Sequence, residues 1–421
     1  MAFVVGGARK VGDEPKTIDL PTVRLFTVTR GYAETPQKDC GGQWAVSTRQ
    51  AAIHFSAVGY FFGRALHEKL GVPIGLINTS VSGTPAELWT SQEGLAADPA
   101  LKSFIETPAQ RERRLAREVD IVAKYKAALA QWQKDAAAAK AAGKTPPRRP
   151  GQPRTGRRIS SLYYAMVAPL TRFRVAGVIW YQGEANAHSV RSALLYAKLF
   201  PAMIRDWRAK WGYELPFLFV QLANFRSRSP EPTDTAWARI RESQKKTLAL
   251  PKTGMAVIID IGERGNVHAK DKQDVGRRLA LAARAIVYGE KDLVYSGPMY
   301  NSMKVEGGKV VLSFDHLGSG LMIGPPEGAI TAGPDQAPKV GAEKLVGFAV
   351  AGADGKFVWA DAKIVGDTVV VGSPEVEKPV AVRYGWDNDP ACNLYNKEGL
   401  PASPFRTDNW KPGGPTPAVR K

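Results

Sequence analysis

The sequence predicts an α/β fold in which a parallel sheet is flanked by helices and followed by a small antiparallel β unit. Between residues 56 and 288, short apolar runs alternate with stretches whose apolar residues recur at helical spacing. After about Ser296 the runs become short and alternating, and glycine turns separate them. Strands that alternate with helices form parallel sheets covered on both faces, whereas short strands joined by tight turns pair in antiparallel fashion.

The first half of the α/β pattern contains two strands. A helix is expected over about 56–70, because its apolar residues share one face and a glycine follows as a C-cap. The first strand follows directly, over 72–78, and the second covers 175–181. The helix that begins near Arg191 is expected to be interrupted at Pro201, because proline lacks the N–H that an α-helix uses.

The second half repeats the pattern twice. Strand 217–222 precedes a helix over about 237–250, and strand 255–260 precedes a helix over about 272–288. The four strands are expected to form one parallel sheet. In the antiparallel unit, strands are expected at 309–314, 345–350 and 368–371.

These elements divide the chain of 421 residues into two domains with an insertion. Residues 1–295 are expected to form the larger domain, 296–386 the small β domain, and 387–421 a C-terminal segment that packs back and ends in a loose tail. Residues 103–160 are expected to form a charged helical insertion, since an alanine-rich stretch precedes one rich in proline and arginine.

More than half of the net charge of +18 lies in that insertion. Between Arg111 and Arg158 there are 14 lysines and arginines against 4 aspartates and glutamates, which accounts for +10. Charge concentrated on one solvated helix, without a nucleic-acid-binding motif, argues against a nucleic-acid partner. Binding of a phosphate backbone by this segment is the minor alternative. No apolar run approaches the length that spans a bilayer, so no membrane partner is expected.

The spacing of cysteines and histidines indicates no metal site. Cys40 and Cys392 lie far apart and without the spacing of metal ligands, and the sequence leaves open whether they pair. The five histidines show no zinc pattern either.

Polar side chains follow the second strand, in residues 177–186. The apolar run ends in Gln182, Glu184 and Asn186, grouped around a glycine. Ligands bind at the carboxyl ends of parallel strands, where amide donors and a carboxylate could take part in chemistry. The alternative is a polar turn after a core strand.

A turn with helix-starting signals follows the first strand, in residues 78–89. Residues 84–87 read Thr-Pro-Ala-Glu, which matches a capping box with proline at the first helical position. Gly83 would let a backbone N–H approach a ligand closely, which suits the stabilisation of an oxyanion. The alternative is an ordinary turn between a strand and a helix.

A histidine lies in the loop after the fourth strand, in residues 260–270. His268 could act as a general base there, because imidazole ordinarily titrates near neutrality. The alternative is a structural or merely exposed histidine.

Together these segments resemble the sialate O-acetylesterase family of the SGNH hydrolases. The resemblance extends, in the family's order and spacing, to residues 215–225, 241–244, 253–289 and 382–410. It implies an SGNH-type parallel sheet and hydrolysis of O-acetyl esters on sugars by a serine nucleophile and a histidine base, without metal or cofactor. The roles that it implies are His268 as the base, Gly83 as a backbone oxyanion donor, and the turn with Gln182, Glu184 and Asn186 as the source of a side-chain donor.

One part of the family pattern is not found. The family's nucleophile lies in a Gly-Gln-Ser-Asn-Met turn, and this sequence contains no such turn. The spacing to residues 23–28 suggests that Met1 is the methionine of that turn, so the serine is expected just upstream of a truncated chain. Ser80 and Ser82 are in-chain alternatives, but neither lies in a Gly-x-Ser-x-Gly elbow, and turn-stabilising roles are expected for them.

The sequence also leaves open which acid orients the histidine. The family often has an aspartate two residues before the histidine, where this chain has Asn266. An asparagine can orient an imidazole but cannot stabilise its charged form as a carboxylate does. Glu184 and Asp260 are the alternatives, unless serine and histidine act as a dyad.

The resemblance implies an O-acetylated sugar as the partner, either sialic acid or another acetylated glycan. Trp89, Trp180 and Tyr181 could stack on a sugar ring, although packing is expected for at least two of them. The competing hypothesis is a non-catalytic carbohydrate-binding protein on an esterase scaffold. Because the family is mostly exported, a secreted or periplasmic full-length protein is expected, although the first ten residues lack the order of a signal peptide.

Overall fold

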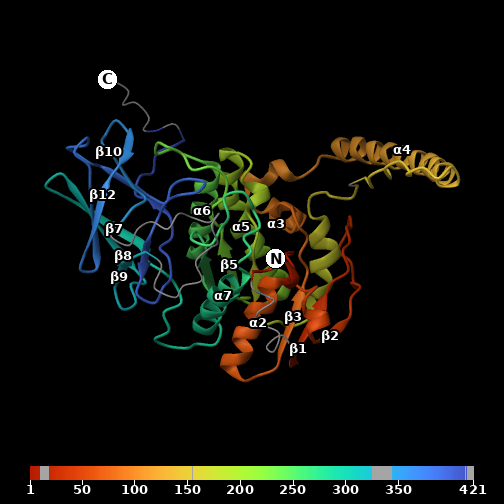
Figure 1. Ribbon diagram of the computed structural model, residues 1–421, viewed down its shortest axis with the longest axis horizontal. Helices are drawn as coiled ribbons and strands as arrows, with labels where there is room; N and C mark the ends of the chain where they lie inside the picture. Colours follow the sequence, from red (N-terminus) through yellow and green to blue (C-terminus); the bar gives the residue numbers. More distant parts are fainter. Residues whose placement is uncertain (10–18, 154, 325–343, 413, 415–421) are drawn as a thin grey trace.

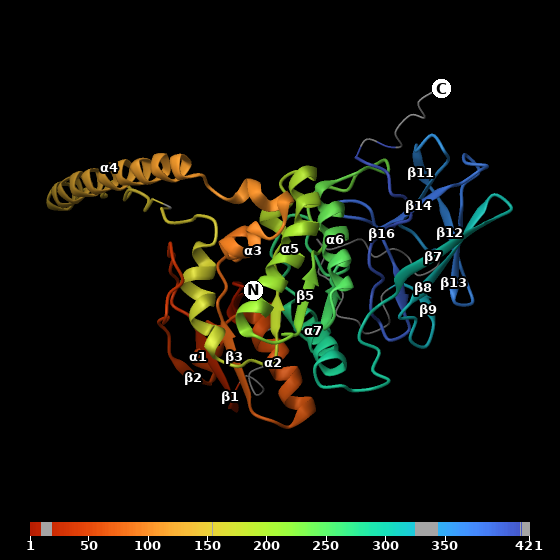
Figure 2. The same cartoon turned by 180° about the vertical axis from the view of Figure 1, so that it is seen from behind.

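The computed structural model of the chain describes residues 1–9, 19–153, 155–324, 344–412 and 414. Figures 1 and 2 show a first body in which helices surround strands, a second body of strands beside it, and one long helix that projects from the first body. Among the helices described, none combines the length and the apolar character needed to cross a membrane.

Strands β1 to β3 form one three-stranded sheet of the first body. β1 (Leu20–Thr27) lies between β2 (Trp44–Ser47) and β3 (Ile74–Asn78), antiparallel to β2 and parallel to β3. β3 confirms the first predicted strand. β1 and β2 were not predicted, because β2 is a largely exposed edge strand and β1 is mostly exposed along its first half.

Strands β4 to β6 form a second three-stranded sheet. β5 (Phe217–Gln221) lies between β4 (Val178–Trp180) and β6 (Thr253–Val257), and all three strands are parallel. They confirm the other three predicted strands, although β4 is shorter and β6 starts earlier than the sequence indicated. The described strands thus form two sheets, with β3 and β4 as edges, where one sheet was expected.

Helices cover these strands on both faces. α2 (Ala57–Leu70) packs against α7 (Lys272–Ile286), and α5 (Val190–Trp211) packs against α6 (Ala236–Lys246). The first predicted helix is confirmed together with its C-cap, since Gly71 is left-handed with a φ of 68°.

The interruption predicted at Pro201 is wrong. α5 continues as one helix through Pro201 as far as Trp211. The side chains of Leu199, Phe200 and Met203, on either side of the proline, are buried. Burial of apolar surface along the whole helix therefore outweighs the loss of one backbone hydrogen bond.

The charged insertion contains the long projecting helix, α4 (Pro108–Ala141), none of whose residues is buried (Figure 1). At its base, Arg111 lies 2.6 Å from a carboxylate oxygen of Glu34. Farther out, Trp132 Nε1 donates to the carbonyl oxygen of Pro147 at 2.8 Å, so the returning segment lies along the helix. The predicted solvated helix is thus present, held by ion pairs at its base rather than by a buried apolar face.

Among the residues described, the second body contains two four-stranded antiparallel sheets, with the orders β11-β10-β14-β16 and β12-β13-β8-β7, and a further pair of β9 with β15. The rings of Phe348, Tyr384 and Phe405 lie 4.6 to 6.5 Å apart in its core. This agrees with the antiparallel strands expected after Ser296. The strands are β7 (Met299–Glu306), β8 (Lys309–Asp315), β9 (Leu321–Ile323), β10 (Phe348–Ala351), β11 (Phe357–Trp359), β12 (Asp361–Val365), β13 (Thr368–Gly372), β14 (Ala381–Tyr384), β15 (Leu394–Asn396) and β16 (Phe405–Arg406).

Short helical elements complete the described structure. The expected domain limits, including 103–160 and 387–421, stay predictions, and the end of the expected loose tail lies outside the described residues. The short elements are η1 (Val5–Gly7), α1 (Arg49–Ala52), η3 (Ala86–Leu88), α3 (Gln92–Ala96), η4 (Pro99–Phe104), η5 (Tyr163–Val167), η6 (Ala168–Arg172), η7 (Glu184–Asn186) and η8 (Thr247–Ala249).

Candidate active site

The polar turn after β4 is bound to the turn after β3. Gln182 Nε2 donates to the carbonyl oxygen of Thr84 at 3.2 Å and to Asn186 Oδ1 at 2.7 Å. Asn186 Oδ1 also accepts from the backbone N–H of Ala86 at 3.0 Å. Gln182 and Asn186 are both buried. Two of the three segments singled out in the sequence therefore meet at the carboxyl ends of their strands.

Most polar atoms of this network have partners inside the protein. Tyr196 Oη donates to Gln182 Oε1 at 3.0 Å, and Asn186 Nδ2 donates to a carboxylate oxygen of Glu87 at 2.9 Å. Burial raises the pKa of the Glu87 carboxyl, and the hydrogen bond from Asn186 acts in the opposite direction. Since both amide hydrogens of Gln182 have acceptors, Asn186 is the better placed of the two to donate to a ligand.

Gly83 lies in the turn after β3 with a left-handed backbone, at a φ of 64°, and with open space where a Cβ would be. The capping box predicted beside it is wrong. Thr84 Oγ1 donates to a carbonyl three residues earlier, and only the short η3 turn follows. The Glu87 carboxylate accepts from Asn186 instead of from the start of a helix. The oxyanion role of Gly83 stays a prediction.

His268 is exposed in the loop between β6 and α7. Its backbone N–H donates to Asn266 Oδ1 at 2.9 Å, and the Glu263 carboxylate accepts from Asn266 Nδ2 at 3.4 Å and from the Lys270 N–H at 3.0 Å. Asn266 therefore shapes the loop rather than orienting the imidazole. The imidazole centre lies 6.2 Å from the Phe3 ring, and no hydrogen bond joins this imidazole to another described residue.

Of the two carboxylates considered as the orienting acid, Asp260 is bound elsewhere. Its oxygens accept from the Arg278 guanidinium at 2.6 and 2.7 Å, and Tyr395 Oη lies 3.3 Å from one of them. Asp260 thus neutralises a buried arginine. Glu184 remains the carboxylate for the acid role, and that role stays a prediction.

A buried lysine lies beside Glu184. Lys272 is the first residue of α7 and is 2% exposed. Its Nζ lies 4.8 Å from the ring centre of Tyr181 and 5.2 Å from that of Phe3. Burial lowers the pKa of Lys272 to about 8, although the Glu184 carboxylate favours the charged form.

The backbone amine of Met1 is buried in the same place. Burial, followed by repulsion from Lys272, lowers the pKa of this amine to about 5, against the attraction of Glu184. The Met1 carbonyl oxygen accepts from Ser56 Oγ at 2.7 Å, at the start of α2. Farther along, the Arg9 N–H donates to the Lys270 carbonyl oxygen. The first residues therefore lie between α2 and the His268 loop.

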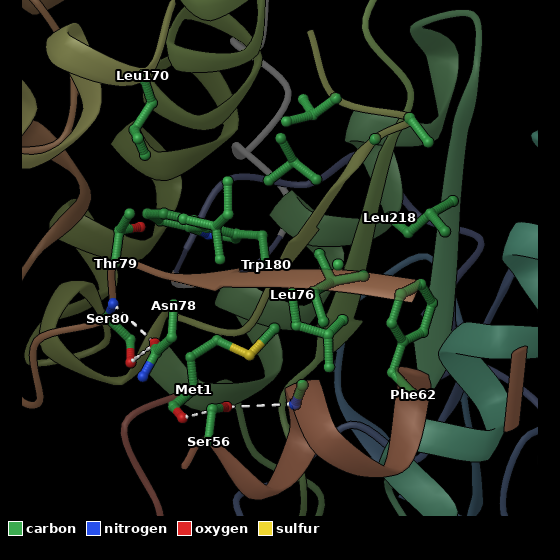
Figure 3. Close-up of a pocket in the computed structure, with 18 of the residues that line it drawn as sticks. Met1, Ser56, Phe62, Leu76, Asn78, Thr79, Ser80, Leu170, Trp180 and Leu218 are labelled. Atoms are coloured by element: carbon green, nitrogen blue, oxygen red, sulfur yellow. Dashed lines mark hydrogen bonds between the residues drawn. The ribbon is translucent and has the colours of Figure 1, made fainter. Parts of the chain in front are cut away.

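An apolar cavity of about 470 Å³ lies between the two sheets of the first body (Figure 3). Residues 73–81, which include β3, and residues 175–182, which include β4, line it; we call this cavity the β3–β4 groove. Figure 3 shows Met1 beside Asn78 and Ser80, at the carboxyl end of β3. The groove thus opens onto the candidate site.

The serines near the groove have structural partners. Ser80 Oγ donates to Asn78 Oδ1 at 2.6 Å, which agrees with the turn-stabilising role expected of it. Ser56 Oγ accepts from the Gly59 N–H and so caps α2. Ser82 is exposed. Among the residues that the structure describes, no serine hydroxyl is hydrogen-bonded to His268.

The aromatic residues considered for stacking on a sugar are engaged in packing. Trp89 and Trp180 are 3% and 8% exposed, and their rings meet edge to face with centres 6.1 Å apart. Tyr181 lies under the Lys272 ammonium. This agrees with the packing role expected for at least two of the three.

Sequence reasoning missed Lys272 and Arg157. A lysine in the first turn of the predicted last helix was an available signal, because a cation is unfavourable at a helix N-terminus. Arg157, from the end of the insertion, donates to the carbonyl oxygen of Gly83. Arg157 and Gly83 are 74 positions apart, and no local sequence pattern joins them.

Comparisons with known proteins point to one family. Residues 128–285 match the family described as carbohydrate esterase, sialic acid-specific acetylesterase. A solved structure, that of the carbohydrate acetylesterase XAC1771 from Xanthomonas citri, is similar to 97% of this chain with 38% identity and a TM-score of 0.77. The match covers 78% of that protein.

Curated relatives are named sialate O-acetylesterases. The rat sialate O-acetylesterase is 34% identical over 304 residues, which cover 66% of this chain and 53% of the relative. The mouse enzyme is 31% identical, with 70% and 56% covered. The chain therefore spans about half the length of the curated relatives that it matches.

Proposed function

Because the chain belongs to the sialate O-acetylesterase family, we propose that it forms the site of a carbohydrate O-acetylesterase. The substrate is sialic acid or another glycan that carries O-acetyl groups. The observation that supports this most directly is the hydrogen-bonded junction of the turns after β3 and β4, in which Gln182 and Asn186 bind Thr84 and Ala86. An acyl-transfer site needs an oxyanion pocket, and we propose the Gly83 N–H and the Asn186 side-chain amide of these turns as its donors.

In the proposed mechanism, a serine hydroxyl attacks the acetyl carbonyl while His268 takes its proton. The Gly83 N–H and the free amide hydrogen of Asn186 hold the oxyanion that forms. His268 returns the proton to the sugar oxygen as the sugar leaves. Water then attacks the acetyl-serine and releases acetate. Glu184 is proposed as the carboxylate that orients the His268 imidazole and stabilises its charged form.

The serine of this mechanism is not assigned to a described residue. Ser80 Oγ donates to Asn78 Oδ1 and Ser56 Oγ donates to the Met1 carbonyl oxygen, so neither is proposed as the nucleophile.

The activity is tested on a generic acetyl ester and on an O-acetylated sialic acid. Replacing His268 by alanine should lower kcat by about 10²- to 10⁴-fold, the range for loss of a general base. The exposed His54, replaced in the same way, is the matched control and should leave kcat unchanged.

Unchanged turnover in the His268→Ala variant would refute the proposed mechanism. Sugar binding without any hydrolysis would instead favour the non-catalytic carbohydrate-binding protein. We also propose that the protein is exported, because the family is mostly exported. Cell fractionation checks this proposal.

A further inference from the structure

We propose that the projecting helix binds an acidic polysaccharide and holds it beside the candidate site. The binding surface consists of α4 and the returning residues 142–153, which we call the basic arm (Figures 1 and 2). This inference rests on the proposed function and deepens it, because it assigns the O-acetylated substrate to polymers whose sugars carry carboxylates. Three features of the arm carry it: unpaired positive charge, a fixed shape, and a connection to the turn that contains Gly83.

The first feature is a surplus of positive charge. The arm contains 11 lysines and arginines against 4 aspartates and glutamates, a net charge of +7. Eight of these cations, from Arg113 to Arg149, are exposed and have no ion-pair partner among the described residues. Because a helix rises about 1.5 Å per residue, those of α4 extend over about 40 Å from Arg113 to Lys140. The arm therefore presents a long, positively charged surface.

This surplus does not stabilise the helix. A helix that is polar on all sides is usually stabilised by pairs of opposite charge four residues apart. In the described part of α4, such pairs occur only in the half near the body. Arg114 Nη1 lies 3.4 Å from Glu118 Oε1, and Lys124 Nζ lies 2.8 Å from Asp120 Oδ2. Farther out the like charges repel each other, and an anionic ligand would remove this repulsion.

The second feature is that the arm is held in a fixed shape. A capping box formed by Thr107 and Gln110 starts α4. The returning segment is held by Trp132, whose Nε1 bonds to Pro147 and whose ring centre lies 5.7 Å from the Arg149 guanidinium. The cations of the returning segment therefore lie along the helix. Because the charges are positioned before a ligand binds, less entropy is lost on binding.

The aromatic residues of the arm argue against two other polyanions. A helix that binds an anionic membrane needs a free apolar face, but Tyr125, Leu129 and Trp132 share a half-buried face, the one along which the returning segment lies. Single-stranded nucleic acids gain affinity by stacking bases on exposed aromatic rings, and neither Tyr125 nor Trp132 is fully exposed. A polymer of acidic sugars requires only the row of cations.

The third feature is the place where the arm returns to the body. Arg157 donates to the carbonyl oxygen of Gly83, and the Ser160 N–H donates to the carbonyl oxygen of Glu87 at 3.0 Å. Both acceptors belong to the turn after β3, which contains the proposed oxyanion donor. A polymer bound to the arm is thus kept near the candidate site, which raises the local concentration of its acetyl groups there.

Binding is tested with the full chain and a fluorescein-labelled fragment of polygalacturonate, by fluorescence anisotropy. Counter-ions are released when the charges pair. If about four carboxylates are neutralised, Kd should therefore rise about 50-fold between about 50 and 200 mM NaCl. Labelled dextran, a neutral polysaccharide, should not bind.

Two matched variants locate the surface. The arm variant replaces four exposed lysines of the arm by glutamine, which has a similar helix propensity, at Lys126, Lys134, Lys140 and Lys144. The control variant makes the same change at four exposed lysines of the second body, Lys309, Lys356, Lys363 and Lys378. Both variants have the same net charge. Kd should rise at least about tenfold in the arm variant and stay unchanged in the control.

An equal rise of Kd in the two variants, or equal binding of dextran and polygalacturonate, would overturn the inference. Tighter binding of an oligothymidylate of equal charge at about 150 mM NaCl would also overturn it, because the arm would then be assigned to nucleic acid.

Hydrolysis distinguishes failure of this inference from failure of the proposed function. On O-acetylated polygalacturonate, the arm variant should raise KM about tenfold and leave kcat unchanged. Both variants should hydrolyse 4-nitrophenyl acetate as the wild type does. Binding of polygalacturonate without hydrolysis of either ester would support the arm and contradict the esterase mechanism. Hydrolysis of both esters with the same KM in the two variants would contradict the inference alone.

Discussion

At the scale of single residues, the candidate site contains two buried amines, those of Met1 and Lys272. The Met1 amine and the Lys272 ammonium repel each other, and burial disfavours the charged form of both. Lys272 lies over the rings of Tyr181 and Phe3, which attract a cation less strongly than a carboxylate in contact would. The carboxylates of Glu184, Asp271 and Glu263 offset part of the cost at longer range. A lysine buried in this way reduces the stability of the folded protein, which suggests a functional role for Lys272 in the site.

Replacing Lys272 by methionine should make the protein more stable at pH 7, by up to about 3 kcal/mol. The pKa of Lys272 is about 8 in the folded protein and about 10.4 in an unfolded chain. The unfolded state therefore binds more protons between these values, and the wild type gains stability as the pH rises from about 8 to about 10.4. Urea denaturation at pH 7 and pH 10.5 measures this, and the advantage of the variant should vanish at the higher pH. A variant less stable than the wild type at pH 7 would contradict the prediction.

Residues of the candidate site could be predicted from the sequence where they directly follow a predicted strand. Asn186 and His268 follow strands, and polar groups at strand ends meet along one edge of a parallel sheet. The partner of each polar group could not be predicted in this way. Asp260 and Glu184 are equivalent in the sequence, but only the fold brings Arg278 to Asp260.

At the scale of elements, α7 begins on an N-cap residue whose charge is buried. Asp271 Oδ1 accepts from the Asp274 N–H at 3.0 Å, as an N-cap should, but the side chain is 1% exposed and its second oxygen has no partner among the described residues. Burial, and then repulsion from Asp274, raises the pKa of Asp271 to about 6. The cap thus combines a favourable hydrogen bond with an unfavourable buried charge.

Asparagine at position 271 should keep the cap and remove the charge. Because the folded pKa of about 6 lies above the unfolded value of about 3.9, wild-type stability falls as the pH rises between them. Asp271→Asn should therefore be more stable than the wild type by about 2 kcal/mol at pH 7, and equal to it near pH 4. Asp271→Ala, which also loses the cap, should be about 1 kcal/mol less stable than the asparagine variant. Thermal denaturation at both pH values tests the order; the same order at pH 4 as at pH 7 would count against it.

Elements with a clear period were predicted, and those that depend on distant contacts were not. α2 and β5 are apolar at regular intervals, so their position follows from the chain itself. The local signal at Pro201 predicted an interruption of the helix, but α5 continues because the neighbouring apolar side chains are buried. They failed again at Thr84, whose hydroxyl binds a carbonyl instead of capping a helix.

At the scale of the whole molecule, the segment after β14 reaches from the second body to the His268 loop. Asp389 is 1% exposed and accepts from Asn224 Nδ2 at 2.8 Å and from Arg264 Nε at 2.9 Å. Asn224 Oδ1 in turn accepts from the Gly262 N–H at 2.8 Å. The C-terminal part of the chain therefore holds the start of the loop that carries His268.

Replacing Asp389 by alanine should loosen that loop. Asn224 and Arg264 lose their acceptor, so backbone amides in residues 262–270 should exchange about tenfold faster in hydrogen-exchange mass spectrometry. Asp408→Ala is the matched control, because its carboxylate is equally buried but pairs with two arginines of the second body. Both variants should lose about 3 kcal/mol of stability. Faster loop exchange in both, or in neither, would disprove the specific link.

The sequence by itself determined the strands β3 to β6, the helices around them, the antiparallel unit and the positions of Gly83, Asn186 and His268 relative to strand ends. These follow from local periodicity and from glycine and proline signals, which act over a few residues. The tertiary structure alone decided that the strands form two sheets with a groove between them, that Asp260 binds Arg278, and that Lys272 is buried beside Glu184. The physical reason is that pairing and burial in these cases depend on residues 18 or more positions apart, which no local pattern encodes.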